Sequence, residues 1–313
     1  MPLLRGGGIL VSELKDLIAR SRWSATHASA NGTAKVPPTV ADLADIASVV
    51  RKNILVMTTA VNSGHPGGSL SATDALVTLY FKYLRYRPSE PAWPSRDRFV
   101  MSKAHASPVV YAVLAEAGFF PREELLTFRR IDSRIQGHTH IKTPGVEFSG
   151  GSLGQGLSFG LGIALAARLD GAAHRTWVML GDGECDEGQV WEAAMSAAHY
   201  RVDNITAIVD RNNGQNDRHT NEAMGLEPFA DKWRAFGWEA IECDGHDIAS
   251  LAAAYDTALA VKGKPAIVIA KTVKGKGVSF MENNMAFHGK AATMDELRQA
   301  FDEIDAAMRR VAV

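Results

Sequence analysis

Short apolar segments alternate with longer segments of helical periodicity from about residue 39 onward. The apolar segments are rich in Val, Ile, Met and Trp, which is typical of strands that are buried on both faces. They span residues 98–102, 175–182, 204–212, 238–245 and 264–273. The helical segments span residues 106–118, 155–171, 188–200 and 248–263. This alternation predicts an α/β fold in which a parallel sheet is covered by helices on both faces.

The two ends of the chain differ from this alternating region. Residues 1–38 contain a short amphipathic segment, VSELKDLIARS, followed by small polar residues and prolines that are typical of a linker. At the other end, Thr293 and Glu296 have the spacing of a helix capping box, and apolar residues recur on one face of the helix that follows. We therefore expect residues 1–38 to form an N-terminal extension and residues 39–313 to form a single domain.

Composition changes this picture only by excluding classes of protein. The chain has 313 residues and a formal net charge of -1, without long blocks of like charge, which gives no reason to expect nucleic acid or an acidic membrane as a partner. It has only Cys185 and Cys243 as cysteines, no signal-peptide pattern and no apolar run long enough to cross a membrane. We therefore expect a cytoplasmic protein without a disulfide framework.

Polar residues follow two of the predicted strands at the point where each strand ends. Asp182 stands between two glycines, and Asn212 comes about thirty residues later, which is the length of a strand–helix–strand unit. The two side chains can therefore lie on adjacent strand ends, at the edge of a parallel sheet where ligands bind. A carboxylate, a carboxamide oxygen and the backbone carbonyl of Gly214 are oxygen donors that suit Mg²⁺ or Ca²⁺. With Gly183, which lets a ligand approach the backbone, they predict a metal-bridged diphosphate site.

Simpler interpretations of the glycine-rich segments stay open from the residues alone. A strand followed by Gly-Asp-Gly is also a common turn. The glycines of SLGQGLSFGLG have the spacing GxGxxxG, which resembles a dinucleotide-binding loop. No apolar strand precedes them and no acidic residue follows at the required distance, so this spacing favours close packing of a helix.

Other candidate residues also have two interpretations. His138 and His140 are spaced like a zinc pair but lack further ligands nearby. Cys185 is expected to be a packing residue, because nothing beside it in sequence lowers a thiol pKa. Lys274 and Lys276 suit either a phosphate contact or a solvated turn. The histidines expected to have structural roles are His174, His199, His219 and His246.

The region around Asp182 and Asn212 resembles a known family. Gly-Asp-Gly followed about thirty residues later by Asn-Asn resembles the thiamine diphosphate signature, and GDGECDEGQVWEAAMSAAHY with DNITAIVDRN is similar to transketolases in particular. Further similar stretches are NSGHPGGSLSATDAL at 62–76, RDRFVMSKAHASPVVYAVL at 96–114, QGH at 136–138, TPGVEFSGGSLGQGL at 143–157 and VKGKGVSFMENNMAFHGKA at 273–291. The likeness covers essentially residues 40–300. It implies the thiamine diphosphate-binding fold and the diphosphate-binding half of a transketolase-like enzyme.

The resemblance also implies roles for individual residues. Asp182, Asn212 and the carbonyl of Gly214 would hold Mg²⁺ on the diphosphate, with Ca²⁺ or Mn²⁺ as substitutes. The residues matching cofactor contacts are Gly151, Ser152, Leu153, Gly183, Asn212, His105 and His288. The residues matching catalytic or substrate-channel positions are His65, His105, His138 and His288, with Glu187 at a subunit interface near the cofactor. Histidine suits this chemistry because imidazole hydrogen-bonds sugar hydroxyls and transfers protons near neutral pH.

Transketolases are considerably longer than this chain. Their second half resembles a pyrimidine-binding domain that supplies a glutamate for cofactor activation and much of the sugar-phosphate site. We therefore expect one subunit of a split enzyme, inactive alone, which joins a separate C-terminal subunit in a heterotetramer with two copies of each. It would transfer a two-carbon ketol unit between sugar phosphates. The segment GHTH at 137–140 departs from the usual GHP of the family, and SKAHA replaces SKGHA, so the sugar itself is not assigned.

Two alternative functions are weighed against this hypothesis. The alpha chain of a 2-oxo-acid dehydrogenase also carries the two-part signature on a separate polypeptide, although NSGHPGG and FHGKA argue against it. A non-catalytic module of the same fold is the second alternative. The intact Asp182, Asn212 and matching histidines argue against such a loss of chemistry.

Overall fold

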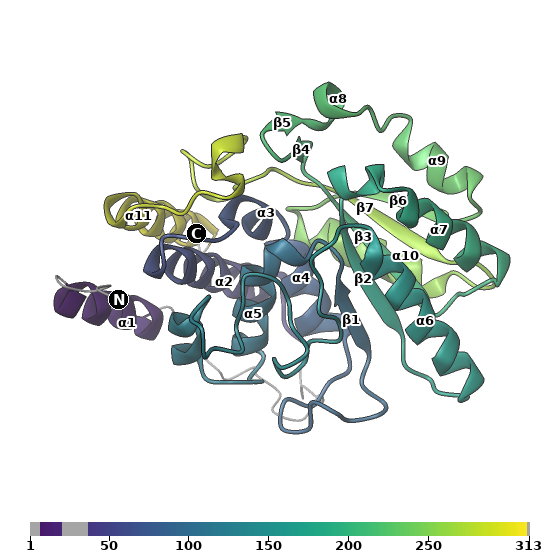
Figure 1. Cartoon of the computed structure of the whole chain (residues 1–313), viewed down its shortest axis with the longest axis horizontal. Coiled ribbons are helices and arrows are strands. Elements are labelled where there is room, and N and C mark those ends of the chain that lie inside the picture. Colours follow the sequence, from purple (N-terminus) through teal and green to yellow (C-terminus); the bar gives the residue numbers. More distant parts are fainter. Residues whose placement is uncertain (1–6, 21–36, 312–313) are drawn as a thin grey trace.

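Five parallel strands form the central sheet of the computed structural model, which describes residues 7–20 and 37–311 (Figure 1). In order across the sheet they are β1 (Arg98–Met101), β2 (Thr176–Gly181), β3 (Ile205–Arg211), β7 (Ala266–Lys271) and β6 (Glu239–Asp244). All five strands expected from the sequence are confirmed. The register pairs Gly181 with Asp210, so β2 and β3 end side by side, with Asp182 and Asn212 just beyond.

Helices occupy most of the remaining chain. They are α1 (Gly7–Arg20), α2 (Val40–Ala60), α3 (Pro66–Ser71), α4 (Thr73–Thr78), α5 (Ser107–Glu116), α6 (Gln155–Leu169), α7 (Gly188–His199), α8 (Thr220–Ala223), α9 (Phe229–Ala235), α10 (Ile248–Ala260) and α11 (Met294–Val311). The predicted helices α5, α6, α7, α10 and α11 are confirmed. A small hairpin, β4 (Gly214–Gln215) with β5 (Arg218–His219), follows β3.

Helices cover both faces of the sheet, as the continuous apolar strands predicted. Successive residues of a strand point to opposite faces, so Val178 and Met179 belong to different cores. Val178 and Val209 pack with the buried side chains of α6, α7 and α9. Met179 and Ile208 pack with those of α2, α4, α5 and α10. The expected covered parallel sheet is therefore confirmed (Figure 1).

The glycine-rich start of α6 packs closely against the sheet. A Cβ atom added at Gly160 would lie 2.4 Å from Val178 Cγ2, and one added at Gly156 would lie 2.5 Å from Ser102 Oγ. Both positions require glycine because a larger residue would push the helix away from the strands. The GxGxxxG spacing therefore serves close helix–sheet packing, as the sequence favoured.

The ends of the described chain lie together on one side. The buried Leu14 and Ile18 of α1 pack into the core that contains α2, and α11 also contacts α2 (Figure 1). The capping box of α11 is confirmed, since Glu296 N donates to Thr293 Oγ1 at 3.2 Å and Thr293 N donates to Glu296 Oε2 at 2.7 Å. Residues 21–36 of the expected linker lie outside the described residues. Within the described ranges, no helix is both long and apolar enough to span a membrane.

The connections after β3 and β7 leave the sheet in opposite directions. The chain after β3 continues to α9, whose side chains pack on one face of the sheet, and the chain after β7 continues to α11, which belongs to the core on the other face. Such divergence opens a crevice at the carboxyl ends of parallel strands. The fold therefore places a binding site beside the ends of β3 and β7.

Candidate functional site

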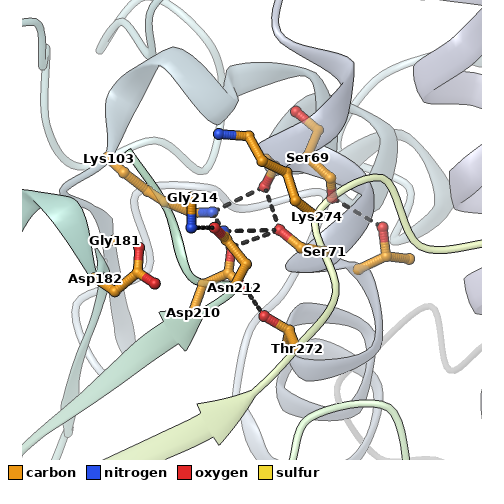
Figure 2. A network of polar contacts seen from close by, with 12 residues as sticks. Ser69, Ser71, Lys103, Gly181, Asp182, Asp210, Asn212, Gly214, Thr272 and Lys274 are labelled. Carbon is orange, nitrogen blue, oxygen red and sulfur yellow. Dashed lines mark hydrogen bonds and ion pairs between the residues drawn. The ribbon is translucent and has the colours of Figure 1, made fainter. Parts of the chain in front are cut away.

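A cavity of about 230 Å³ opens at the carboxyl ends of β1, β2, β3 and β7. We call it the central cavity. Its walls include both strand-end residues expected from the sequence, Asp182 and Asn212, together with Gly214. Figure 2 shows these residues around one point of the sheet edge. The structure thus brings together the residues on which the predicted metal site depends.

Asp182 is a buried carboxylate that lacks full compensation for its charge. It accepts hydrogen bonds from the backbone N–H groups of Gly183 at 2.8 Å and Asn213 at 2.6 Å, and from Arg211 at 3.2 Å. Burial nevertheless raises its pKa to about 6, and the nearby Asp210 carboxylate adds to this increase. A cation in the cavity would stabilise the ionised form of Asp182.

Asn212 presents its amide between the sheet and the cavity. Its Oδ1 accepts from the backbone N–H of Gly214 at 3.0 Å, and its Nδ2 donates to Asp210. Among the described residues no cluster of three or more His, Cys, Asp or Glu side chains could hold a metal ion. A metal here would therefore depend on one carboxylate together with amide and carbonyl oxygens.

The segment expected to contact the cofactor lies partly at the cavity. Leu153 lines it, whereas Gly151 and Ser152 are exposed and lie outside its lining. The buried Glu184 holds this segment, because its carboxylate accepts from the N–H groups of Gly154 and Gly181, each at 2.9 Å. The sequence analysis did not single out Glu184, although it lies inside the signature.

Gly183 forms part of the cavity wall where there is no space for a side chain. A Cβ atom there would lie 2.8 Å from Gln215 Cγ, so the turn after β2 approaches the β4–β5 hairpin closely. This glycine is therefore needed for the close approach of Gln215, and its expected contact with a ligand stays a prediction.

Three histidines form a cluster at the cavity. The ring centroids of His65, His105 and His288 lie 5.1 to 5.4 Å apart in each pair. Burial is the main cause that lowers their pKa values, to about 4 for His65, about 2 for His105 and about 3 for His288. The nearby cations, among them Lys274, lower all three pKa values further. The cluster is therefore neutral at pH 7 and offers both donor and acceptor nitrogens.

His138 and Glu187 stand apart from this cluster. His138 is exposed and outside the lining of the central cavity, although its charge influences the pKa of His65. Burial and the Arg129 guanidinium lower the pKa of His138 itself. Glu187 lines the cavity rim, exposed, at the amino end of α7. Their expected roles in a substrate channel and at a subunit interface stay predictions.

Lys274 and Lys276 have different environments. Lys274 is buried at 1% exposure, lines the central cavity and places its Nζ 2.9 Å from His288 Nδ1. Burial, then repulsion from Lys103, lowers the pKa of Lys274 to about 8. Lys276 lies 3.6 Å from Glu282 and does not line this cavity. The geometry therefore favours Lys274 as the anion contact of the two.

The sequence analysis missed a buried ion pair between the wall of the central cavity and β3. Lys103 pairs with Asp210, and Lys103 Nζ also donates to the carbonyl of Gly68 at 2.8 Å. The residues are 107 positions apart in sequence, so no local spacing could reveal the pair. The only sequence signal was a lysine and an aspartate, each two residues before an expected site residue, His105 and Asn212.

The simpler interpretations of two other residues agree with the structure. Cys185 is buried, and burial raises its thiol pKa well above the usual value, as expected of a packing residue. His140 Nδ1 accepts from the backbone N–H of Lys142 at 3.1 Å, a local turn contact.

Comparisons with known proteins agree with this geometry. The family model of transketolase, thiamine diphosphate binding domain, matches residues 44–306. The chain is 42% identical over 265 residues to 6-deoxy-6-sulfo-D-fructose transketolase subunit SqwG of Clostridium sp. (strain MSTE9), covering 84% of this chain and 96% of that protein. It is 39% identical over 261 residues to one of the subunits of apulose-4-phosphate transketolase from Phocaeicola vulgatus, covering 83% of this chain and 93% of that protein.

Longer relatives match only in part. Transketolase of Rattus norvegicus is 42% identical over 264 residues, which are 84% of this chain and 42% of that protein. The crystal structure of transketolase from Campylobacter jejuni superimposes with a TM-score of 0.78 at 30% identity, over 87% of this chain and 45% of that chain. This chain therefore spans less than half the length of these relatives. Taken with the family match over residues 44–306, the chain belongs to the transketolase family and carries its thiamine diphosphate binding domain.

Proposed function

We propose that this chain is the diphosphate-binding subunit of a split transketolase-type enzyme. With a separate subunit that carries the pyrimidine-binding domain, it transfers a two-carbon ketol unit between sugar phosphates. The observation that carries this proposal is the convergence of Asp182 and Asn212 on one cavity whose walls also contain Lys274 and neutral histidines. The names of two similar proteins contain the word subunit, which supports division of the enzyme between two chains.

The charges of the central cavity fit a metal–diphosphate group. Asp182 has a raised pKa because burial and repulsion from Asp210 outweigh the Arg211 charge and its backbone hydrogen bonds, and a divalent cation would supply further positive charge. Lys274 has a lowered pKa because burial and repulsion from Lys103 outweigh the attraction of Asp182 and Asp210, and a phosphate would add the negative charge that is lacking. The two deficits have opposite signs and occur in one cavity. Asp182, Asn212 and the carbonyl of Gly214 would hold Mg²⁺, and Lys274 would bind the diphosphate.

The neutral histidines suit the transfer of protons between substrate and protein. Thiamine diphosphate, when bound, supplies a sink for the electron pair released when a ketose C–C bond breaks. His65, His105 and His288 stay neutral at pH 7, so His65 and His105 can each donate one hydrogen bond and accept another from sugar hydroxyls. His288 accepts from Lys274 through Nδ1 and can donate through Nε2. His138 and Glu187 would complete the substrate channel and the subunit interface, and Gly151, Ser152, Leu153 and Gly183 would contact the cofactor through their backbone.

We infer further that residues 1–38 are an extension to a domain formed by residues 39–313, and that the enzyme is a cytoplasmic heterotetramer with two copies of each subunit. The family match over residues 44–306 supports this division of the chain. Sedimentation of the chain with its partner tests the stoichiometry. A complex of any other composition contradicts it.

The experiment for the main function uses the chain with its partner subunit. Thiamine diphosphate is titrated with and without Mg²⁺, and the complex is assayed with ketose phosphates in one arm and 2-oxo acids in the other. The ketoses include apulose 4-phosphate and 6-deoxy-6-sulfo-D-fructose, because two similar proteins carry these names. Saturable, Mg²⁺-dependent binding with turnover of a ketose alone is expected. Turnover of 2-oxo acids, or of a ketose by this chain without its partner, contradicts the proposal.

A further inference from the structure

The amide of Asn212 is held from behind by a buried carboxylate. Its Nδ2 donates to Asp210 Oδ2 at 2.8 Å and to Ser71 Oγ at 3.3 Å. The other arm of the amide, Oδ1, accepts from the N–H of Gly214, a residue that lines the central cavity. An ionised carboxylate only accepts hydrogen bonds, so Asp210 favours the NH₂ arm of the amide and disfavours its oxygen. The carboxylate thereby selects one of the two orientations of the amide.

The side chain of Asp210 is held in place by an ion pair and several hydrogen bonds. It is 2% exposed and forms an ion pair with Lys103. It also accepts from the hydroxyl of Ser71 at 2.6 Å and from the hydroxyl of Thr272. Although burial opposes ionisation, Lys103 and these hydroxyls hold the pKa of Asp210 below its usual value. Figure 2 shows the network joining the ends of β3 and β7 to α3.

Two partners of Asp210 are each followed, two residues later, by a residue that lines the central cavity. Lys103 is followed two residues later by His105, and Thr272 is followed two residues later by Lys274. Asp210 itself precedes Asn212 by the same interval. Fixing the first residue of each pair therefore limits where the second can lie. Lys103 itself lines the central cavity, so the network around Asp210 reaches the cavity wall directly.

We propose that Asp210 is a positioning residue, which fixes the Asn212 amide with its oxygen available to a metal ion and its NH₂ turned away. The inference rests on the proposed function, in which Asn212 contributes an oxygen to Mg²⁺. A reversed amide would direct its N–H groups at the cation, which is repulsive. Residues that orient a metal ligand commonly change metal affinity by about 10- to 100-fold when they are replaced.

A matched pair of variants separates the acceptor on residue 210 from its charge. Lys103→Met with Asp210→Leu removes the ion pair and the acceptor oxygen, whereas Lys103→Met with Asp210→Asn removes the same ion pair but keeps an acceptor. Replacing both members of the pair avoids an uncompensated buried charge. Any difference between the variants therefore reports on the acceptor that faces Asn212.

Two measurements are made on each variant and on the unaltered chain. The first is the exchange of the Asn212 side-chain amide protons with water, by NMR of the full chain labelled with ¹⁵N-asparagine and without added ligand. The second is the Mg²⁺ concentration that gives half-maximal binding of thiamine diphosphate to the chain with its partner. With Leu at position 210 we expect exchange at least about tenfold faster and a Mg²⁺ requirement about tenfold higher than with Asn there.

The outcomes distinguish this inference from the proposed function. Equal amide exchange and equal Mg²⁺ requirement in the two variants overturn the positioning role and leave the function intact. If the unaltered chain with its partner binds no thiamine diphosphate with Mg²⁺, the proposed function is wrong, and the metal-ligand role of Asn212 falls with it. Slow exchange that depends on the acceptor would then show Asp210 to be structural only, which also overturns the proposal.

A second pair of variants applies if the Leu variant does not fold. A carboxylate is a good Mg²⁺ ligand. If Asp210 had no effect on the side chain at position 212, Asn212→Asp alone should therefore not weaken Mg²⁺ binding. We expect instead an increase of about tenfold in the Mg²⁺ requirement, because two carboxylates would face each other. Adding Asp210→Asn supplies an NH₂ donor and should restore most of the affinity. Absence of that restoration in a folded double variant overturns the inference.

Discussion

Two hollows at the same edge of the sheet contain similar residues but use them differently. The central cavity lies over β1, β2, β3 and β7, and a second one, which we call the edge hollow, lies at the ends of β6 and β7. In the edge hollow His246 Nδ1 pairs with Asp74 at 2.7 Å, and its Nε2 accepts from the N–H of Val273 at 2.8 Å. Lys271 lies 3.1 Å from Glu242. Arg51 also pairs with Asp74, so the charges and hydrogen bonds of these groups are satisfied within the protein.

The central cavity lacks this internal compensation. Lys274 is buried with a lowered pKa. His65 packs against His105 and His288 of the cavity wall, and among the described residues its buried Nδ1 has no hydrogen-bond partner. Asp182 has a raised pKa although it accepts three hydrogen bonds. The comparison teaches that a histidine, a lysine and an aspartate at a sheet edge indicate a ligand only where their charges and hydrogen bonds are incomplete without one.

The largest difference between the two hollows is expected when an aspartate at the end of a strand is replaced in each. We expect Asp182→Asn to raise the Mg²⁺ concentration for half-maximal binding of thiamine diphosphate at least about 100-fold, because it removes the one carboxylate expected to bind the metal directly. Isothermal titration of the chain with its partner measures this effect. The matched variant is Asp244→Asn at the end of β6, whose carboxylate accepts from the N–H of His246. If both variants weaken Mg²⁺ binding equally, the distinction between the hollows fails.

Replacing Lys274 and Lys276 in turn should have a smaller effect on cofactor binding and tests which of the two contacts the anion. Lys274→Met should weaken binding of thiamine diphosphate about 10- to 150-fold, since a charge-assisted hydrogen bond contributes about 1.5–3 kcal/mol. Lys276→Met should leave this dissociation constant within about twofold, because Lys276 lies outside the central cavity. Titration of the cofactor at saturating Mg²⁺ gives both values. An effect of Lys276→Met as large as that of Lys274→Met would contradict the assignment of the anion contact.

The stability of the ligand-free chain should depend on pH through the histidine cluster. Histidines titrate near 6.5 in the unfolded chain but stay neutral in the folded chain to about pH 4 or below. As the pH falls below about 6.5 the unfolded chain therefore binds more protons, and each histidine lowers stability by up to about 1.4 kcal/mol per pH unit. Asp182 acts oppositely between its folded pKa of about 6 and its usual pKa of 3.8, as do Glu184 and Asp186, whose pKa values burial also raises. The lowered pKa values of His138 and His174 add to the effect of the cluster.

Urea unfolding at pH 7.5, 6.5 and 5.5 measures this dependence. We expect the free energy of unfolding to decrease toward pH 5.5, and His288→Gln to make the decrease shallower by about one proton. The sign would be contradicted by stability that rises toward pH 5.5. A decrease that stays as steep in His288→Gln would remove that histidine from the explanation.

The smallest effect on the cavity is expected from the histidine of the edge hollow. His246→Gln loses at least one of two structural hydrogen bonds, and should lower the free energy of unfolding by about 1–3 kcal/mol. Binding of thiamine diphosphate should change by less than about twofold, because His246 does not line the central cavity. Thermal unfolding and cofactor titration on the same sample test both halves. A large loss of cofactor affinity in a folded variant would show that the edge hollow contributes to cofactor binding, which contradicts the prediction.

The sequence predicted the features that depend on local patterns. The strands β2 and β3 are continuous apolar runs, and the spacing of Asp182 and Asn212 was enough to place both at adjacent strand ends. The capping box at Thr293 and the close packing of α6 at Gly160 followed from spacing for the same reason. The resemblance supplied His105 and His288, which the structure brings together with their ring centroids 5.3 Å apart.

Features set by distant residues could not be predicted in this way. Lys103 and Asp210 meet only because β1 and β3 are separated by one strand, an order that the sequence pattern does not specify. The sequence favoured a structural role for His246 and left Lys274 open between a phosphate contact and a solvated turn. Only their partners distinguish a structural residue from a binding residue, and those partners include Asp74 and His288 from other parts of the chain.

The network around Asp210 has a consequence for how the molecule acquires its activity. Its contacts join positions 62, 107 and 139 residues apart, so they close long loops and cannot form early from neighbouring segments. During synthesis the growing polypeptide would already contain the Gly-Asp-Gly and Asn-Asn signature while still lacking β7 with Thr272 and Lys274. We expect a nascent chain halted before β7 to have no affinity for the cofactor even with the partner subunit present, because Thr272, Lys274 and His288 are then still missing.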